Sequence, residues 1–288
     1  MQGVWLADQR YKKGIYTFSD GATSEGKFKD GQIDGRAILT FPDGERFEGV
    51  IRNGKRCGKG TTTWPNGSRM SCYYKDDKPN GMGFFTSPDG EKYKGRYADG
   101  VRHGKGVLRE ADGSLYNGSF KNGKKHGYGV LKPANGGIYK GEFKNDRFDG
   151  KGSLIRADGE KYIGEFKNGV RCGFGECFLP NGVRYRGEWA DDINHGYGTM
   201  WLPNGSMYSG GWKKGKIHGN NGFMACDGHT YEGSFIDGEI NGFGIMICSD
   251  GTKYEGEWKN ANRHGRGKLT YPNGKTEEGR WENDRFIG

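Results

Sequence analysis

A 23-residue period runs through this chain and constrains the fold more than any other feature. From Tyr93 to Tyr254, the pattern Tyr-x-Gly-x-aromatic returns every 23 residues, and weaker copies precede and follow this stretch. The repeats begin at residues 1, 24, 47, 70, 93, 116, 139, 162, 185, 208, 231 and 254, with a half repeat at 277–288. Such a period is typical of stacked architectures, in which each unit buries its apolar surface against the next. We therefore predict a single array of about twelve and a half repeats over residues 1–288.

Each repeat position keeps one kind of residue. Position 3 is glycine except at Cys72, and position 5 is aromatic except at Ile51. Position 12 is glycine except at Lys12, and position 14 is mostly glycine, with Ala37 and Asn221 as exceptions. Positions 20 and 21 read Asp-Gly or Asn-Gly throughout. No insertion or deletion interrupts the count.

Two turns divide each repeat into two short strands. Sequences such as Pro42-Asp43-Gly44 suit a type I turn closed by a left-handed glycine, which is a common three-residue hairpin loop. A second turn falls near positions 7 and 8, as at Asn122-Gly123. Two turns in 23 residues predict one β-hairpin per repeat, with neighbouring hairpins paired in an all-β, antiparallel array.

Strand alternation predicts how the core is built. It places positions 1, 3 and 5 (aromatic, glycine, aromatic) on one face, and positions 12, 14 and 16 on one face of the next strand. The chain has 56 glycines and 14% aromatic residues but only 32% hydrophobic residues, which favours a thin structure over a deep aliphatic core. We predict that the rings lie over the glycines. Stacked hairpins would then form an elongated, right-handedly twisted rod about 120 Å long.

The patterns Tyr-x-Gly-x-Phe/Trp, His-Gly-x-Gly and Pro-Asn/Asp-Gly resemble those of the MORN (membrane occupation and recognition nexus) repeat family. The resemblance covers the chain and is looser before Tyr93, where Ser24, Met70 and Cys72 depart from the pattern. It implies a twisted antiparallel β-solenoid. It also implies several roles: membrane tethers, arrays beside kinase or methyltransferase domains, the body of radial-spoke head proteins in cilia, and cytoskeletal scaffolds.

The residues offer no clear catalytic or metal centre. Catalysis requires unlike groups that converge in a pocket, whereas the Ser, His, Asp and Glu residues here fall in repeated positions. Five histidines occupy position 11, where Asp, Asn and Cys also occur, and we interpret this position as one that hydrogen-bonds a loop backbone. The five are His103, His126, His195, His218 and His264. Copies about 10 Å apart are too distant to share one zinc ion within a chain, although a site that bridges two chains stays open. We expect no enzyme activity and no cofactor.

Two sets of residues are candidates for binding. The first is an aromatic and glycine groove, which we expect to hold a partner segment: Tyr93, Tyr97, Tyr116, Phe120, Tyr139, Phe143, Tyr162, Phe166, Tyr185, Trp189, Tyr208 and Trp212. The second is a basic face made by position 6: Lys121, Lys144, Lys167, Lys213 and Lys259. Because alternation sends position 6 to the face opposite the rings, rings and charges are segregated, which disfavours nucleic acid as a partner.

These observations favour a non-catalytic protein-binding scaffold of cytoskeletal or ciliary (axonemal) assemblies. The alternative is a membrane-associated tether that binds anionic phospholipids through the basic face, since the net charge is +9. A regulatory array fused to a kinase or methyltransferase is a weaker third hypothesis. The sequence has no apolar run of about 20 residues and no apolar signal-peptide core, which predicts a cytoplasmic location. The six cysteines are then expected to be reduced thiols. Uncapped strand edges at both ends of the array predict either that it is a portion of something longer or that a second copy or a partner covers its ends, and we favour association.

Overall fold

The computed structural model describes residues 3–8 and 13–288. Throughout this part of the chain the elements are β-strands that pair antiparallel, and no helix occurs in it, let alone one that could span a bilayer. The chain divides into two compact units, Met1–Arg147 and Phe148–Gly288. The predicted all-β, antiparallel fold class is therefore confirmed.

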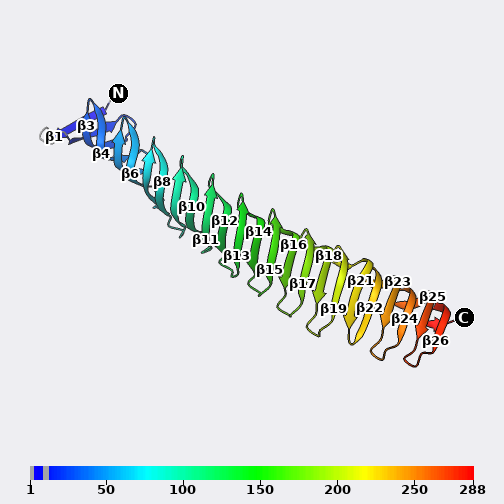
Figure 1. Ribbon diagram of the computed structural model, residues 1–288. Helices are drawn as coiled ribbons and strands as arrows, with labels where there is room; N and C mark the ends of the chain where they lie inside the picture. The colour runs from blue at the N-terminus through cyan, green and yellow to red at the C-terminus, as the bar shows by residue number, and fades with distance from the viewer. Residues whose placement is uncertain (1–2, 9–12) are drawn as a thin grey trace. The chain divides into compact units, whose positions relative to one another are not determined.

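In the first unit each strand pairs with the strand that follows it in sequence, so that successive hairpins lie side by side (Figure 1). Its strands are β1 (Gly3–Asp8), β2 (Lys13–Phe18), β3 (Thr23–Lys29), β4 (Gln32–Thr40), β5 (Arg46–Arg52), β6 (Lys55–Thr63), β7 (Arg69–Lys75), β8 (Lys78–Thr86), β9 (Lys92–Ala98), β10 (Val101–Arg109), β11 (Leu115–Lys121), β12 (Lys124–Lys132) and β13 (Ile138–Lys144).

The second unit follows the same rule, except that β19 pairs with both β20 and β21. Its strands are β14 (Arg147–Ile155), β15 (Lys161–Lys167), β16 (Val170–Phe178), β17 (Arg184–Ala190), β18 (Ile193–Trp201), β19 (Met207–Lys213), β20 (Lys216–Ile217), β21 (Gly219–Cys226), β22 (His229–Ile236), β23 (Glu239–Ile247), β24 (Lys253–Lys259), β25 (Asn262–Thr270), β26 (Thr276–Glu282) and β27 (Arg285–Phe286).

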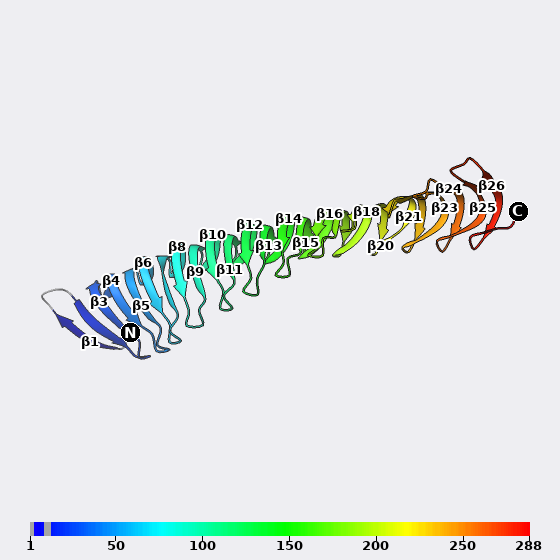
Figure 2. The ribbon, with the colours of Figure 1, turned by 90° about the horizontal axis from the view of Figure 1, so that it is seen from below.

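Both predicted turns are present, and they line the edges of each sheet (Figure 2). At Pro203-Asn204-Gly205, the Gly205 N–H donates to the Leu202 carbonyl at 3.1 Å, and Gly205 has the left-handed φ of +87°. In the second turn Asn122 and Gly123 have φ values of +51° and +82°, as a two-residue I′ turn requires. The Gly123 N–H also donates to the Arg102 carbonyl of the preceding repeat at 2.9 Å, which ties neighbouring turns together.

The rings lie over the glycines, as predicted. Gly106 stands opposite Gly95 on one side and Gly118 on the other. A Cβ atom built on Gly106 would lie 2.5 Å from the hydroxyl oxygen of Tyr93, closer than any real Cβ contact. Tyr93 is fully buried, and its hydroxyl donates to the Arg96 carbonyl at 3.0 Å. The core of each unit is therefore a layer of aromatic rings on a glycine backbone.

A β-bulge in the second strand of most repeats was not foreseen. In β10 the pairing with β9 shifts between Arg102 and Gly106, and Gly104 (position 12) has a φ of +64°. The position-12 glycines thus supply a left-handed backbone conformation rather than only room for a ring. A bulge bends its strand and changes the direction of the side chains beyond it. It therefore places the side chains at positions 13 and 15 on the face opposite the rings.

The repeat that begins at Tyr208 differs in local structure from its neighbours. There Gly222, not Asn221, stands opposite Gly233, and Met224 pairs with Tyr208. The extra residue in the strand is offset by a shorter turn of two residues, Asp227 and Gly228, so the 23-residue count is kept. A constant repeat length therefore conceals an insertion and a deletion that cancel.

The ring-on-glycine contact predicts a large cost for one methyl group. We expect Gly106→Ala to lower the free energy of unfolding by about 1–3 kcal/mol, because the new Cβ atom has to displace Tyr93. Lys105→Ala is the matched control, since Lys105 is the exposed neighbour on the same strand. Chemical denaturation of the full chain measures both. Equal stabilities of the two variants would contradict the proposed packing.

The buried tyrosines predict a loss of stability at high pH. Burial raises the pKa to about 12 in six of them: Tyr93, Tyr97, Tyr116, Tyr208, Tyr231 and Tyr254. Since the folded chain holds these protons more tightly than the unfolded chain, where the pKa is near 10, their contribution is complete below about pH 10 and declines from there toward pH 12. Denaturation midpoints measured from pH 8 to 11.5 should fall above pH 10, and less steeply in Tyr93→Phe. A flat profile would contradict this.

Candidate partner-binding surface

The two faces of each sheet differ in what covers them. On β9 the side chains of Tyr93 and Tyr97 are buried, whereas Lys94 and Arg96, which alternate with them, are exposed. We call the side that carries positions 1, 3 and 5 the ring face. The side that carries positions 2, 4, 13 and 15 is the open face. On the open face a partner can reach side chains without disturbing the core.

The ring face is closed by the chain's own side chains. Tyr116 makes edge-to-face contacts with Phe120 in its own repeat and with Phe143 in the next, each with ring centroids 5.1 Å apart. Charged groups cover the rings in several repeats. The Arg171 guanidinium lies 4.3 Å from the centroid of the Trp189 ring and forms a 2.7 Å ion pair with Glu160. Such edge-to-face and cation–π contacts are each worth about 0.5–1.5 kcal/mol.

The twelve aromatic residues predicted to line a partner groove all lie in this layer, and none is more than 7% exposed. They are Tyr93, Tyr97, Tyr116, Phe120, Tyr139, Phe143, Tyr162, Phe166, Tyr185, Trp189, Tyr208 and Trp212. A partner that contacted these rings would have to displace their neighbours. Their observed contacts are those of core residues, and the accessible hollow described below uses other side chains.

The five lysines of the predicted basic face are all exposed: Lys121, Lys144, Lys167, Lys213 and Lys259. Each precedes a hairpin turn, and the turn contains Asn in every case except that of Lys213, which is followed by Lys214-Gly215. The Lys167 ammonium lies 3.7 Å from the Asp149 carboxylate, so part of its charge is compensated within the second unit. The lysines are accessible, but they are interspersed with acidic and amide groups.

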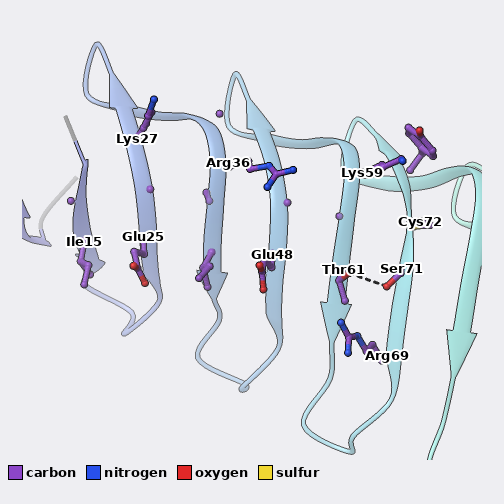
Figure 3. Close-up of a pocket in the computed structure, with 18 of the residues that line it drawn as sticks. Ile15, Glu25, Lys27, Arg36, Glu48, Lys59, Thr61, Arg69, Ser71 and Cys72 are labelled. Atoms are coloured by element: carbon purple, nitrogen blue, oxygen red, sulfur yellow. Dashed lines mark hydrogen bonds between the residues drawn. The ribbon is translucent and has the colours of Figure 1, made fainter. Parts of the chain in front are cut away.

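The open face of the first unit holds a groove of about 1320 Å³. It crosses the strands from β2 to β8, and its floor is glycine backbone, including Gly26, Gly49 and Gly60 (Figure 3). Three large apolar side chains on its lining are substantially exposed, namely Ile15 (42%), Tyr73 (46%) and Met82 (51%). Exposed apolar side chains around a concave surface are typical of sites that bind other molecules.

Charged and hydroxyl side chains stand in two rows along this groove. Lys27, Arg36 and Lys59 form one row, and they follow one another on β3, β4 and β6 (Figure 3). The second row holds Glu25 and Glu48 and then two hydroxyl residues, Thr61 and Ser71, whose oxygens are 2.9 Å apart. Periodicity could not have revealed these rows, because positions 2, 4, 13 and 15 do not keep one residue type.

The match to a known family is extensive. The MORN repeat model matches twelve consecutive segments: residues 13–23, 25–46, 47–69, 73–92, 93–115, 116–138, 139–161, 162–184, 185–207, 208–220, 231–253 and 254–276. The chain belongs to the MORN repeat family. The predicted resemblance is therefore confirmed. The MORN match is shortened at residues 221–230, where the structure shows the shifted strand and the two-residue turn.

Solved structures with likeness to this MORN chain are distant in sequence. The TCP domain of Drosophila melanogaster Sas-4, solved with a proline-rich motif of Ana2, is 13% identical, with 57% of this chain and 90% of that chain covered and a TM-score of 0.35. The TCP10 domain of Danio rerio CPAP is 11% identical, with coverages of 97% and 95% and a TM-score of 0.22. Virginiamycin B lyase from Staphylococcus aureus is 13% identical, with coverages of 98% and 88% and a TM-score of 0.14. Such low TM-scores do not bear on function. A search of curated proteins gave no match.

Position 11 of the MORN repeat hydrogen-bonds the turn of the next repeat, as predicted, at three places. Asp149 accepts from the Asn168 N–H at 3.2 Å, and Asn241 accepts from the Asn260 N–H at 3.0 Å. His218 accepts from the N–H of Asp237 through Nδ1, at 3.4 Å. Within residues 3–8 and 13–288, no three His, Cys, Asp or Glu side chains are grouped as metal ligands. These three side chains thus support the backbone of the adjoining turn, whereas the buried Nδ1 atoms of His126 and His264, also at position 11, have no hydrogen-bond partner among the residues that the structure describes.

All six cysteines are free thiols, and Cys172 and Cys177 are not bonded to each other. Cys72 and Cys177 are buried in the ring layer. Burial raises the pKa of the Cys72 thiol, and burial together with the nearby Glu160 carboxylate raises that of Cys177 to about 11. Both thiols are therefore protonated at neutral pH and shielded from reagents.

This burial predicts two classes of thiol. We expect Cys72 and Cys177 to react with a disulfide reagent at least tenfold more slowly than Cys226 and Cys248, because the thiolate is the nucleophile and access is limited. Stopped reactions mapped by mass spectrometry measure the order of labelling. In denaturant all six should react at similar rates, which serves as the control. Early labelling of Cys177 in the folded chain would contradict its placement in the core.

Proposed function

We propose that this MORN chain is a non-catalytic scaffold that holds a segment of a partner protein in the groove of its first unit. The observation that carries the proposal is the groove itself, with its glycine floor and its exposed Ile15, Tyr73 and Met82. A groove that crosses seven strands about 4.8 Å apart extends for about 29 Å. This length suits about nineteen residues of a helix, or about nine of an extended chain.

The open face suits binding because its side chains are not required for the core. Substitutions there leave the ring layer intact, so recognition and folding are served by different sets of residues. We propose a cytoskeletal or ciliary assembly as the setting, since the MORN family includes the body of radial-spoke head proteins and cytoskeletal scaffolds. This setting rests on family membership rather than on a particular side chain.

The test is a selection of displayed peptides on the intact chain, followed by affinity measurements on groove variants. We expect the double variant Thr61→Trp, Ser71→Trp to bind the selected peptides at least about tenfold more weakly, because the two indoles obstruct the groove. The control is Thr199→Trp, Ser209→Trp in the second unit. It has the same repeat positions and the same hydroxyl pair at 2.9 Å. Peptides that bind both variants equally, or no selected peptides, would overturn the proposal.

A membrane tether is the competing function, and the observation in its favour is the exposure of Lys121, Lys144, Lys167, Lys213 and Lys259. Sedimentation with vesicles that contain 30% phosphatidylserine separates the two functions. A tether requires salt-sensitive binding that is lost when these five lysines are changed to glutamine. A scaffold requires groove-dependent peptide binding that persists in the same variant.

A further inference from the structure

The two rows along the groove of the first unit have opposite charge. Lys27, Arg36 and Lys59 are exposed and stand on one side, while Glu25 and Glu48 stand on the other (Figure 3). Glycine backbone lies between the rows, so no side chain fills the space that separates them. The groove therefore presents a basic edge and an edge on which Glu25 and Glu48 stand with Arg69 to any molecule that lies in it.

The rows do not neutralise each other. No ion pair within 4 Å joins them in the described part of the chain. Glu25 and Lys27 lie two residues apart on one strand, which separates their backbones by about 6.8 Å. Glu48 is paired with Arg46 on its own strand at 3.2 Å, and the Lys59 ammonium lies 5.6 Å from the centroid of the Tyr73 ring. The charges of Lys27 and Arg36 thus face solvent.

This arrangement discriminates between classes of ligand. A polyphosphate, a nucleic acid or an anionic bilayer would bring negative charge close to Glu25 and Glu48 while it neutralised the basic row. Like charges brought together in this way cost binding energy. A polypeptide segment avoids the cost, since it can carry carboxylates along one edge and ammonium or guanidinium groups along the other.

The spacing of the basic row favours a helix over an extended segment. Strands about 4.8 Å apart place Lys27, Arg36 and Lys59 at about 0, 5 and 14 Å along the groove. On a helix, residues i, i+3 and i+10 lie at about 0, 4.5 and 15 Å and within about 80° of one another around the axis. In an extended chain, side chains on one edge recur about every 6.7 Å and miss the middle position.

We propose that the groove binds a partner helix with carboxylates at i, i+3 and i+10 along one edge and basic residues about seven apart along the other. This deepens the proposed function and rests on it. The two charge rows also set the direction of the helix, because a helix turned end for end would present its acidic edge to Glu25 and Glu48. The small or apolar side chains between the edges would lie against the glycine floor.

The test uses a displayed library of helical 20-residue peptides with randomised edges, selected on the full chain. We expect selected peptides to carry the i, i+3, i+10 carboxylates. Their affinity should fall at least about tenfold for Lys27→Glu, Arg36→Glu, Lys59→Glu. The control is Arg266→Glu, Lys268→Glu, Arg280→Glu, which reverses three exposed charges on the open face of the second unit. Peptides with the two edges exchanged should bind the groove triple variant better than the unmodified chain.

The outcomes separate this inference from the function on which it rests. Selected peptides could bind Thr61→Trp, Ser71→Trp more weakly and yet lack the carboxylate pattern and bind the charge-reversed variant unchanged. That result would overturn the inference about charge recognition and leave the scaffold proposal supported. If no peptide depends on the groove, the scaffold proposal itself fails. If anionic vesicles bind the groove and the triple reversal abolishes that binding, a lipid replaces the helix as the ligand.

Discussion

The contact of an aromatic ring with glycine backbone is the interaction on which the rest of the structure depends. A tyrosine ring such as Tyr116 fits only because Gly118 and Gly129 have no side chains, and its hydroxyl donates to the Ser119 carbonyl at 2.8 Å. The same ring contacts aromatic residues of two repeats, so each repeat completes the core of its neighbour. This shared core explains how a chain with few aliphatic residues folds. It also commits the rings to the core.

The bulge links this core to the open face, and position 4 beside it differs between the second unit and the groove. In the second unit, position-4 carboxylates accept the backbone N–H of position 13 beyond the bulge: Glu188 from Tyr197 and Glu257 from Arg266, each at 2.9 Å. These acids therefore have a structural task. In the repeats that line the groove, position 4 holds Lys27, Val50 and Tyr73 instead, so no carboxylate is present there to accept such a bond. Those side chains project from the sheet without that task, which is why the groove has a basic and partly apolar edge there.

The sequence period predicts most of the fold but little of the candidate binding site. Because the ring layer and the two turns recur along most of the array, the sequence predicts them from repetition alone. Gly222 shows the limit of that reasoning, since the shifted strand and the shortened turn at Asp227 cancel in the count. The groove could not be predicted from the period either. Its rows combine residues from different repeat positions, such as Lys27 and Arg36, that become neighbours only through the register and the bulge.

The separation of core and open face has a consequence for how such a chain acquires partners. On the open face of the second unit the rings of Phe174, Tyr197 and Phe243 are more than half exposed, whereas the corresponding positions in the groove are mainly basic. Neither set disturbs the ring layer, because each points away from it. An array of this kind can therefore vary its recognition surface one repeat at a time at little cost in stability. Since each strand advances the surface by about 4.8 Å, recognition then depends on the spacing of charges along the array, and that spacing is a property a partner helix can match.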